Sequence, residues 1–206
     1  MESWKAKILL DLNSISRVAV IEQAYGVEKM LINYTKLLKY RWSYEGKAIT
    51  ANMELAHVEM LLEYYQVKWN KCLTFQIHKE NSVTSDIDIS SLIIPHFTLC
   101  GTLINCLEEI QAIGMPLVEI KVLTSIVDDK PIVTIIFQGN LYFEQVRENI
   151  LSKQSTEYDT FYIAQRKWIN KYGNDSVTVK VERESLMIKF TINEVVSINK
   201  IRIGES

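Results

Sequence analysis

Residues 93–114, IIPHFTLCGTLINCLEEIQAIG, form the longest stretch of this 206-residue sequence with few charged side chains. Its apolar residues recur at intervals of three and four, the spacing of one buried face of an α-helix. They are Phe97, Leu99, Leu103, Ile104, Leu107, Ile110 and Ile113. One polar residue, Asn105, lies in the middle of this run, and a buried amide needs hydrogen-bond partners. Those partners are either other groups of the protein or a bound ligand, and the pattern leaves both open.

The segment before this helix predicts a helical hairpin. Residues 5–24 and 27–43 each repeat apolar side chains at helical spacing, and Gly26 separates them. In the first helix this face consists of Ile8, Leu12, Ile15 and Val18 or Ala19. The short connection predicts that the two helices lie antiparallel. Two helices alone leave an apolar face uncovered, and a four-helix bundle made by two copies would bury it.

After residue 46 the chain alternates between helices and strands. Thr50 is a candidate N-cap for a helix over residues 51–69. The residues of this helix that are predicted to point inward are Leu55, Val58, Leu61 or Leu62, Tyr65 and Trp69. Further helices are predicted at 141–153 and 161–172, and strands at 73–78, 117–124, 131–138, 176–182, 186–192 and 195–203. This order predicts the α+β class, with a hairpin domain over 1–46 and a two-layer α/β sandwich over 47–206.

The bulk composition narrows the class of protein. The chain is 48% hydrophobic and 23% charged, as in a globular protein. A net charge of -2 argues against a general nucleic-acid binder. Three widely spaced cysteines fit reduced thiols in the cytoplasm better than a disulfide framework. Neither a signal peptide nor a membrane-spanning segment is predicted.

Motifs of common enzyme chemistry are absent from the sequence. The seven glycines are scattered, so neither a phosphate-binding loop nor a dinucleotide fingerprint is present. His96 is predicted to be a structural residue at a helix start, and His57 to lie on the exposed flank of its helix. Glu108 and Glu109 are adjacent on a helix, so they fit a solvated face better than an acid–base pair. The residues alone therefore predict no catalytic residue and no metal site.

The order of the segments resembles the sensor histidine kinases of the LytS and YehU type, in which dimerisation helices precede a GHKL-type ATPase domain. The resemblance covers nearly the whole chain and is strongest over residues 37–77, where the family has Leu-Leu-Arg-Tyr and then an acidic-Leu helix. The matching residues are Leu37, Leu38, Lys39, Tyr40, Glu54, Leu55, Tyr65, Lys68 and Trp69. The stretch IIPHFTLCGTLINCLEEI resembles the N-box helix of the family. LNSIS at 12–16 resembles the segment after its phospho-acceptor, and WINKYG at 168–173 the helix end after its second Gly box.

Most functional residues of that family have no counterpart here. Counting back from LNSIS, the phospho-acceptor histidine falls on Ala6, which has no nucleophile. The N-box asparagine, which holds magnesium and phosphates in the family, matches Asn105, whereas the general-base glutamate falls on Ile104. The adenine-reading aspartate falls near Gln138, in QGN. The other substituted positions are Glu108 and Glu109 in the N-box, and Tyr158, Thr160, Glu184 and Ser185 in the second Gly box.

These replacements have physical consequences for nucleotide binding. Without the aspartate, adenine loses the acceptor for its amino group, and without the glycines a lid cannot bring its backbone close to the phosphates. Asn105 alone is a weak magnesium anchor, because hard cations favour carboxylate and phosphate oxygens. Asn105 would then be a vestigial nucleotide-binding residue whose amide is satisfied by the protein.

The resemblance therefore implies a protein of two-component signal transduction that is catalytically degenerate and acts by protein–protein binding. Its expected partners are a second copy of itself or an active kinase, and a response regulator, with no cofactor, nucleic acid or membrane span. The alternative is an active or partly active ATP-dependent histidine kinase with a non-standard site. That alternative alone requires ATP and magnesium.

Overall fold

The computed structural model describes residues 3–70, 72–79, 88–114, 117–140, 142–152 and 160–193. Its helices are α1 (Ser3–Ile21), α2 (Tyr25–Ser43), α3 (Ala51–Lys68), α4 (Thr98–Ile113), α5 (Phe143–Ser152) and α6 (Thr160–Tyr172), with short 3-10 helices η1 (Ile89–Ser91) and η2 (Asn174–Ser176). Its strands are β1 (Ala48–Thr50), β2 (Leu73–Lys79), β3 (Ile93–Pro95), β4 (Val118–Val127), β5 (Lys130–Gln138), β6 (Val177–Glu182) and β7 (Ser185–Thr191). The strand predicted at 195–203 lies outside the described residues.

The strands form a five-stranded mixed sheet and a small two-stranded one. The order in the large sheet is β2-β4-β5-β7-β6, with β2 parallel to β4 and the other neighbours antiparallel. Strand β5 is central, and its nearly continuous apolar sequence is typical of a strand that is buried in the sheet. Asp128 and Asp129 make the tight turn between β4 and β5 with φ of 51° and 60°, the left-handed conformation of the common hairpin turns. The small sheet pairs β1 with β3.

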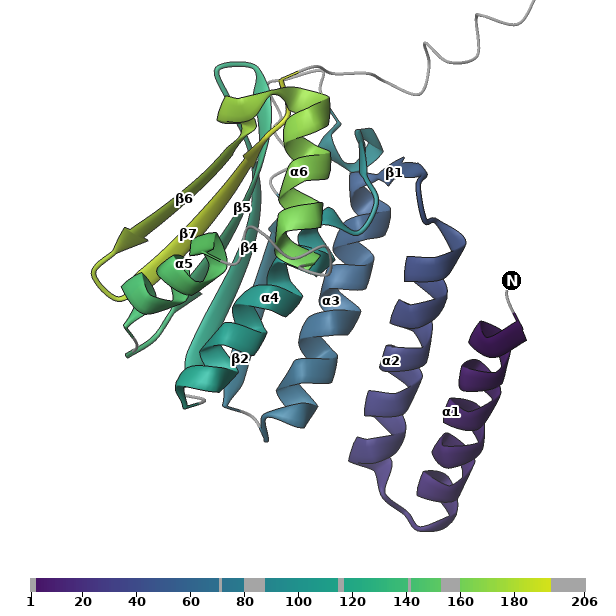
Figure 1. The fold of residues 1–206 in the computed structure, drawn as a ribbon. Helices are drawn as coiled ribbons and strands as arrows, with labels where there is room; N and C mark the ends of the chain where they lie inside the picture. The colour runs from purple at the N-terminus through teal and green to yellow at the C-terminus, as the bar shows by residue number, and fades with distance from the viewer. Residues whose placement is uncertain are drawn as a thin grey trace, which may run out of the picture.

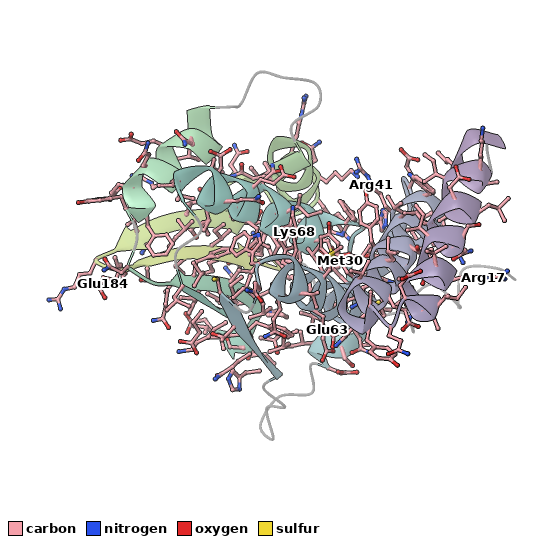
Figure 2. The ribbon with its side chains drawn as sticks, turned by 90° about the horizontal axis from the view of Figure 1, so that it is seen from below. Arg17, Met30, Arg41, Glu63, Lys68 and Glu184 are labelled. Carbon is pink, nitrogen blue, oxygen red and sulfur yellow. The ribbon has the colours of Figure 1, made fainter. Side chains whose placement is uncertain are left out.

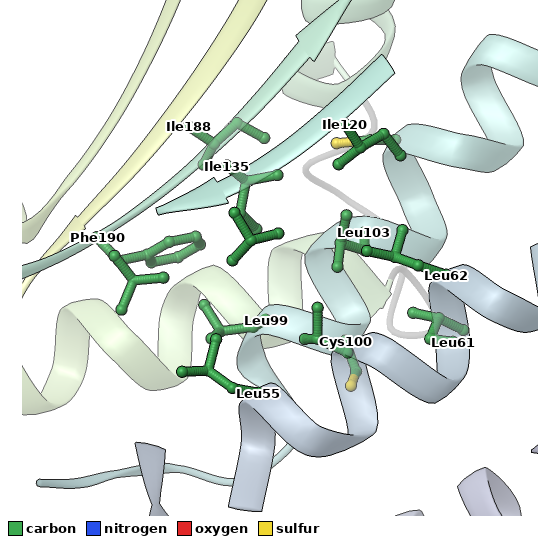
Figure 3. Close-up of a cluster of buried hydrophobic side chains, with 14 of the residues drawn as sticks. Leu55, Leu61, Leu62, Leu99, Cys100, Leu103, Ile120, Ile135, Ile188 and Phe190 are labelled. Atoms are coloured by element: carbon green, nitrogen blue, oxygen red, sulfur yellow. The ribbon is translucent and has the colours of Figure 1, made fainter. Parts of the chain in front are cut away.

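The core lies between the large sheet and the helices that cover one of its faces (Figure 1). Figure 3 shows how α3 and α4 turn leucines toward isoleucines of the sheet. The labelled residues at this contact are Leu55, Leu61, Leu62, Leu99, Leu103, Ile120, Ile135 and Ile188. All of these side chains are buried, and so are Val58, Tyr65 and Trp69, the other residues that the sequence predicted to point inward. The described chain is thus a mixed α+β structure, in the class that the sequence predicted.

The first two helices lie on the side of α3 that is remote from the sheet (Figure 1). They run in opposite directions, with α2 against α3 and α1 outermost. Gly26 lies inside the first turn of α2, so the prediction that it separates the helices is wrong. The turn consists of residues 22–24, where Gln23 has a φ of 57°.

The face predicted to be buried on α1 is largely exposed. Leu9 and Ala19 are buried, whereas Ile8, Ile15 and Val18 are exposed by 38%, 52% and 55%. The reason is that α1 packs against α2 along one narrow stripe and has no described neighbour on its other side (Figure 1). The hairpin therefore presents a row of apolar side chains outward.

The helix predicted in the stretch 93–114 is shorter than that stretch. Residues 93–95 form β3 instead, because they pair with β1. Phe97 then adopts the left-handed conformation, with φ of 63°, and α4 begins at Thr98. The helix ends at Gly114, whose φ of 125° suits a residue without a Cβ. The residue at the start of this helix therefore provides no side-chain cap.

Candidate functional site

The best-defined polar centre of the protein is a buried carboxylate at the start of α4. Glu54 lies in the first turn of α3 and is fully buried. Its Oε1 accepts hydrogen bonds from the backbone N–H of Leu99 at 3.0 Å and of Cys100 at 3.1 Å. Its Oε2 accepts from the backbone N–H of Phe97 at 3.0 Å and from the hydroxyl of Tyr40 on α2. One side chain thus joins α2, α3 and α4.

Glu54 replaces the cap that the sequence of α4 does not provide. The first N–H groups of a helix have no partner within the helix, and a Ser, Thr, Asp or Asn before the helix usually accepts one. Phe97 occupies that position and has no side-chain oxygen. The carboxylate of Glu54 satisfies three of these donors and sits at the positive end of the helix dipole. We call Tyr40, Glu54 and the first turn of α4 the cap cluster.

Aromatic rings enclose the tyrosine of the cap cluster. The ring of His57 stacks on that of Tyr40, with centroids 3.6 Å apart, and the ring of His96 meets its edge at 4.6 Å. His96 Nε2 lies 3.1 Å from the backbone oxygen of Tyr40 and donates to it. His96 is therefore a structural residue before the helix, as predicted. His57 is half-buried and its Nδ1 donates to Met53 O at 2.7 Å, so the prediction of an exposed flank position is wrong.

Burial sets the protonation of the cap cluster. Burial and the nearby carboxylate of Glu54 raise the pKa of Tyr40, which keeps its hydroxyl protonated as a donor. Burial raises the pKa of Glu54, while its bonds from Tyr40 and the backbone oppose that rise. Burial, followed by the positive charge of Lys167, lowers the pKa of His96 to about 4. His96 is thus neutral at pH 7, and its Nδ1 has no hydrogen-bond partner among the described residues.

The structure places Asn105 two turns further along α4. Its side chain is half-buried and takes part in an interaction within the protein. Ile104, at the position of the general base in the resemblance, is also half-buried. Glu108 is exposed as predicted, but Glu109 is buried and accepts a hydrogen bond from Asn149 Nδ2 on α5 at 3.0 Å. The prediction of a solvated face is therefore wrong for Glu109, because α5 covers that side of α4.

Gln138 lies at the end of β5 on the sheet face opposite the helices. Its neighbour Phe137 is fully buried in the core, and successive side chains of a strand point to opposite faces. Gln138 Oε1 accepts from Lys121 Nζ at 2.9 Å, and the same ammonium group lies 3.3 Å from the carboxylate of Glu119. The side-chain oxygen of Gln138 is thus bound by a residue of the neighbouring strand β4.

The glycine of QGN has a structural reason. A Cβ on Gly139 would lie 2.5 Å from the backbone oxygen of Leu117, so only glycine fits this close approach of two chain segments. Gln138 and Gly139 also line an open surface hollow of about 430 Å³ beside the turn between β6 and β7. That hollow includes Glu184 and Ser185, and its remaining lining residues are Glu182 and Arg183. The sequence-predicted positions in β5 and in this turn therefore lie together, whereas Asn105 is not among the residues lining this hollow.

Other predicted positions are less informative. Ala6 is half-buried on α1. Tyr158 lies outside the described residues, and Thr160 begins α6 with its side chain undescribed. Among the described residues no group of three or more side chains has the arrangement of a metal site. Within the residues that the structure describes, no helix is both long enough and apolar enough to span a membrane.

Sequence reasoning missed the role of Glu54, although a signal was present. Glu54 precedes Val58, Leu61 and Tyr65 at spacings of four, three and four, so it belongs to the inward stripe of its helix. A carboxylate on a stripe of core residues needs donors, and the start of a neighbouring helix supplies them. The sequence interpretation named Glu54 only as a residue that matches the resembling family.

Comparison with known proteins shows the class of fold. No protein-family model matches the sequence, and a search of curated proteins found no match. Among solved structures, the chain is similar to a nucleotide-free catalytic domain of the histidine kinase ThkA, with a TM-score of 0.50, 16% identity, and coverage of 71% of this chain and 94% of that one. The Acinetobacter baumannii histidine kinase AdeS gives 0.44, with 10% identity, 92% of this chain and 96% of that one. ThkA in complex with the response regulator TrrA gives 0.43, with 16% identity, 91% and 59%.

The first of these similarities defines a histidine-kinase ATPase-like fold. At these identities it describes the fold alone. The activity of the chain has to be argued from its own residues.

Proposed function

We propose that this protein is a catalytically degenerate relative of the LytS-type histidine kinases and acts by binding other proteins. The observation that carries the proposal is the pairing of this fold with substituted site positions. Ala6 replaces the phospho-acceptor and Ile104 the general base in the matched segments. The adenine-reading aspartate falls near Gln138, whose side-chain oxygen is already bound by Lys121. Asn105 alone keeps the residue type of the family, as a remnant of a nucleotide site.

The exposed apolar row on α1 supports binding of a second hairpin. Ile8, Ile15 and Val18 lie at spacings of seven and three, which places them on one side of the helix. A second copy of the hairpin would cover this row and complete a four-helix bundle. In this proposal residues 1–46 are the dimerisation domain and residues 47–206 the ATPase-like domain. The same surface would accept the hairpin of an active kinase, and the ATPase-like domain would be presented to a response regulator.

Phosphotransfer and nucleotide binding test the proposed lack of catalysis. The purified 206-residue chain is incubated with magnesium and γ-labelled ATP, and titrated with magnesium-ATP in a calorimeter. We expect no label that survives base but not acid, and no binding heat. Base-stable label, or micromolar binding that Asn105→Ala removes, would instead establish the alternative of an active kinase with a non-standard site.

Oligomeric state tests the proposed dimer. We expect light scattering to give twice the mass of the 23.9 kDa chain, and Val18→Lys to shift the protein to the monomer. The matched control is Val127→Lys, because Val127 is 48% exposed, close to the 55% of Val18, but lies at the tip of the β4–β5 hairpin. A wild-type monomer at all concentrations, or equal effects of the two substitutions, would refute dimerisation through α1.

A further inference from the structure

We propose that the cap cluster couples the helical hairpin to the N-terminus of α4, so that a movement of α2 along α3 is transmitted to the first turn of that helix. This inference goes beyond the proposed function and does not depend on it. It requires only the contacts of Tyr40 and Glu54.

Two separate contacts connect α2 to the start of α4. The hydroxyl of Tyr40 donates to Glu54, which in turn holds the backbone of Leu99 and Cys100. The backbone oxygen of the same tyrosine accepts from His96, two residues before the helix. Because both contacts originate from one residue of α2, a displacement of that residue acts on the side chain that caps α4 and on the segment that leads into it.

The carboxylate between these elements has no spare acceptor position. Each oxygen of Glu54 accepts two hydrogen bonds from Tyr40 and the backbone, and the thiol of Cys100 is a further donor to the carboxylate. The group is fully buried, so water does not replace a lost donor. Loss of the Tyr40 bond would therefore change how the remaining donors share the carboxylate. The first-turn amides of α4 are the donors that report such a change.

The position of α2 along α3 is set by contacts away from the cap cluster. Asn33 Nδ2 donates to Glu63 Oε2 at 2.9 Å, and Lys29 lies 3.4 Å from the same carboxylate. Figure 2 shows Glu63 on the side of α3 next to α2. Asn33 is seven residues, or about two turns, before Tyr40, so it lies away from the cap cluster on the same helix. It provides a perturbation that touches neither Glu54 nor α4.

A double-mutant cycle on amide exchange tests the coupling in the full chain. Hydrogen–deuterium exchange of the Leu99 and Cys100 amides is followed by NMR in wild type, Asn33→Ala, Tyr40→Phe and the double variant. The Phe137 amide in β5 reports global unfolding. We expect each single substitution to speed exchange at Leu99 and Cys100 by about five- to tenfold relative to Phe137. The double variant should be no faster than Tyr40→Phe, because the pathway is already broken.

Three results would overturn the proposal. In the first, Asn33→Ala leaves the exchange rates of the Leu99 and Cys100 amides unchanged. In the second, the rate increases of the two single substitutions multiply in the double variant. In the third, exchange at Phe137 accelerates by the same factor as at Leu99 and Cys100. Tyr142→Phe is the matched control, since it removes the hydroxyl of a tyrosine that is 83% exposed. It should leave all these rates unchanged.

Discussion

Replacing Glu54 should destabilise the protein more than any surface carboxylate does. Glu54→Ala leaves three backbone N–H groups and one tyrosine hydroxyl without their acceptor in a buried site. A buried donor without a partner costs about 1–3 kcal/mol, so the lower end for four donors is ~4 kcal/mol. That loss is comparable to the whole stability of many domains, about 5–15 kcal/mol. We therefore expect Glu54→Ala to retain little stability, with a urea midpoint far below that of the wild type.

Glu54→Gln is the more informative variant because it keeps the shape. The amide oxygen still accepts two bonds, and Tyr40 can turn its hydroxyl to accept from the new NH₂ group. Only the N–H of Phe97 then lacks an acceptor, and the negative charge at the helix dipole is lost. The expected cost is about 2 kcal/mol.

Urea denaturation followed by circular dichroism measures both variants, with the slope checked for two-state behaviour. The control is Glu59→Gln, an exposed residue of the same helix, which should change the free energy of unfolding by less than about 0.5 kcal/mol. Equal midpoints and slopes for Glu54→Gln and Glu59→Gln would refute the reasoning, because the carboxylate would then not be needed as a cap.

Three further predictions concern buried side chains. Because the pKa of His96 falls from its usual 6.5 to about 4, the unfolded chain binds its proton first on acidification, and up to about 3 kcal/mol of stability is lost between these pH values. The difference between the pH–stability curves of wild type and His96→Gln should show this loss. The raised pKa of Glu54 makes both proteins more stable on acidification, so it cancels in that difference. Parallel curves would contradict the prediction. Half-buried Cys72 should react with a thiol reagent in the native state. Cys100 and Cys106 are buried and have a raised pKa, so they should react only on unfolding. Equal reaction rates of the three thiols in the native protein would contradict this prediction. Trp168→Phe removes a buried indole that donates to a β7 carbonyl at 3.1 Å, and should lower the free energy of unfolding by about 1–3 kcal/mol, as measured in urea. An unchanged free energy of unfolding would show that this contact of α6 with the sheet does not stabilise the fold.

Local patterns predicted most of the elements but not their partners. The strand at 131–138 and the end of the helical stretch at residue 114 depend on neighbouring residues, and both are found where the sequence predicted them. The Thr50 cap also forms, with its side chain accepting from Met53 N at 3.3 Å. In contrast, the start of α4 was misplaced because residues 93–95 pair with β1. The paired residues are 47 positions apart at Ala48 and Pro95 and 43 apart at Thr50 and Ile93, a separation that no local window contains.

The candidate site was predictable only as a set of substitutions. Residue types alone identify Ala6 and Ile104 as replacements in a resembling pattern. They do not reveal that Gln138 faces away from the helices and is held by Lys121, because that depends on the pairing of β4 with β5. Glu109 was misjudged for the same reason, since its burial is caused by α5, which follows 30 or more residues later in the chain.

The capping of α4 by a distant carboxylate has a consequence for folding. The donors of its first turn find their acceptor 43 to 46 residues earlier in the chain, so closing that loop is a condition for ordering the turn. A helix without a local cap is a poor site of nucleation at that end. The C-terminal turns of α4 can form early, whereas its beginning is fixed only when α3 has docked. The segment that most strongly marks the fold in the sequence is thus, at its first turn, among the late parts to become ordered.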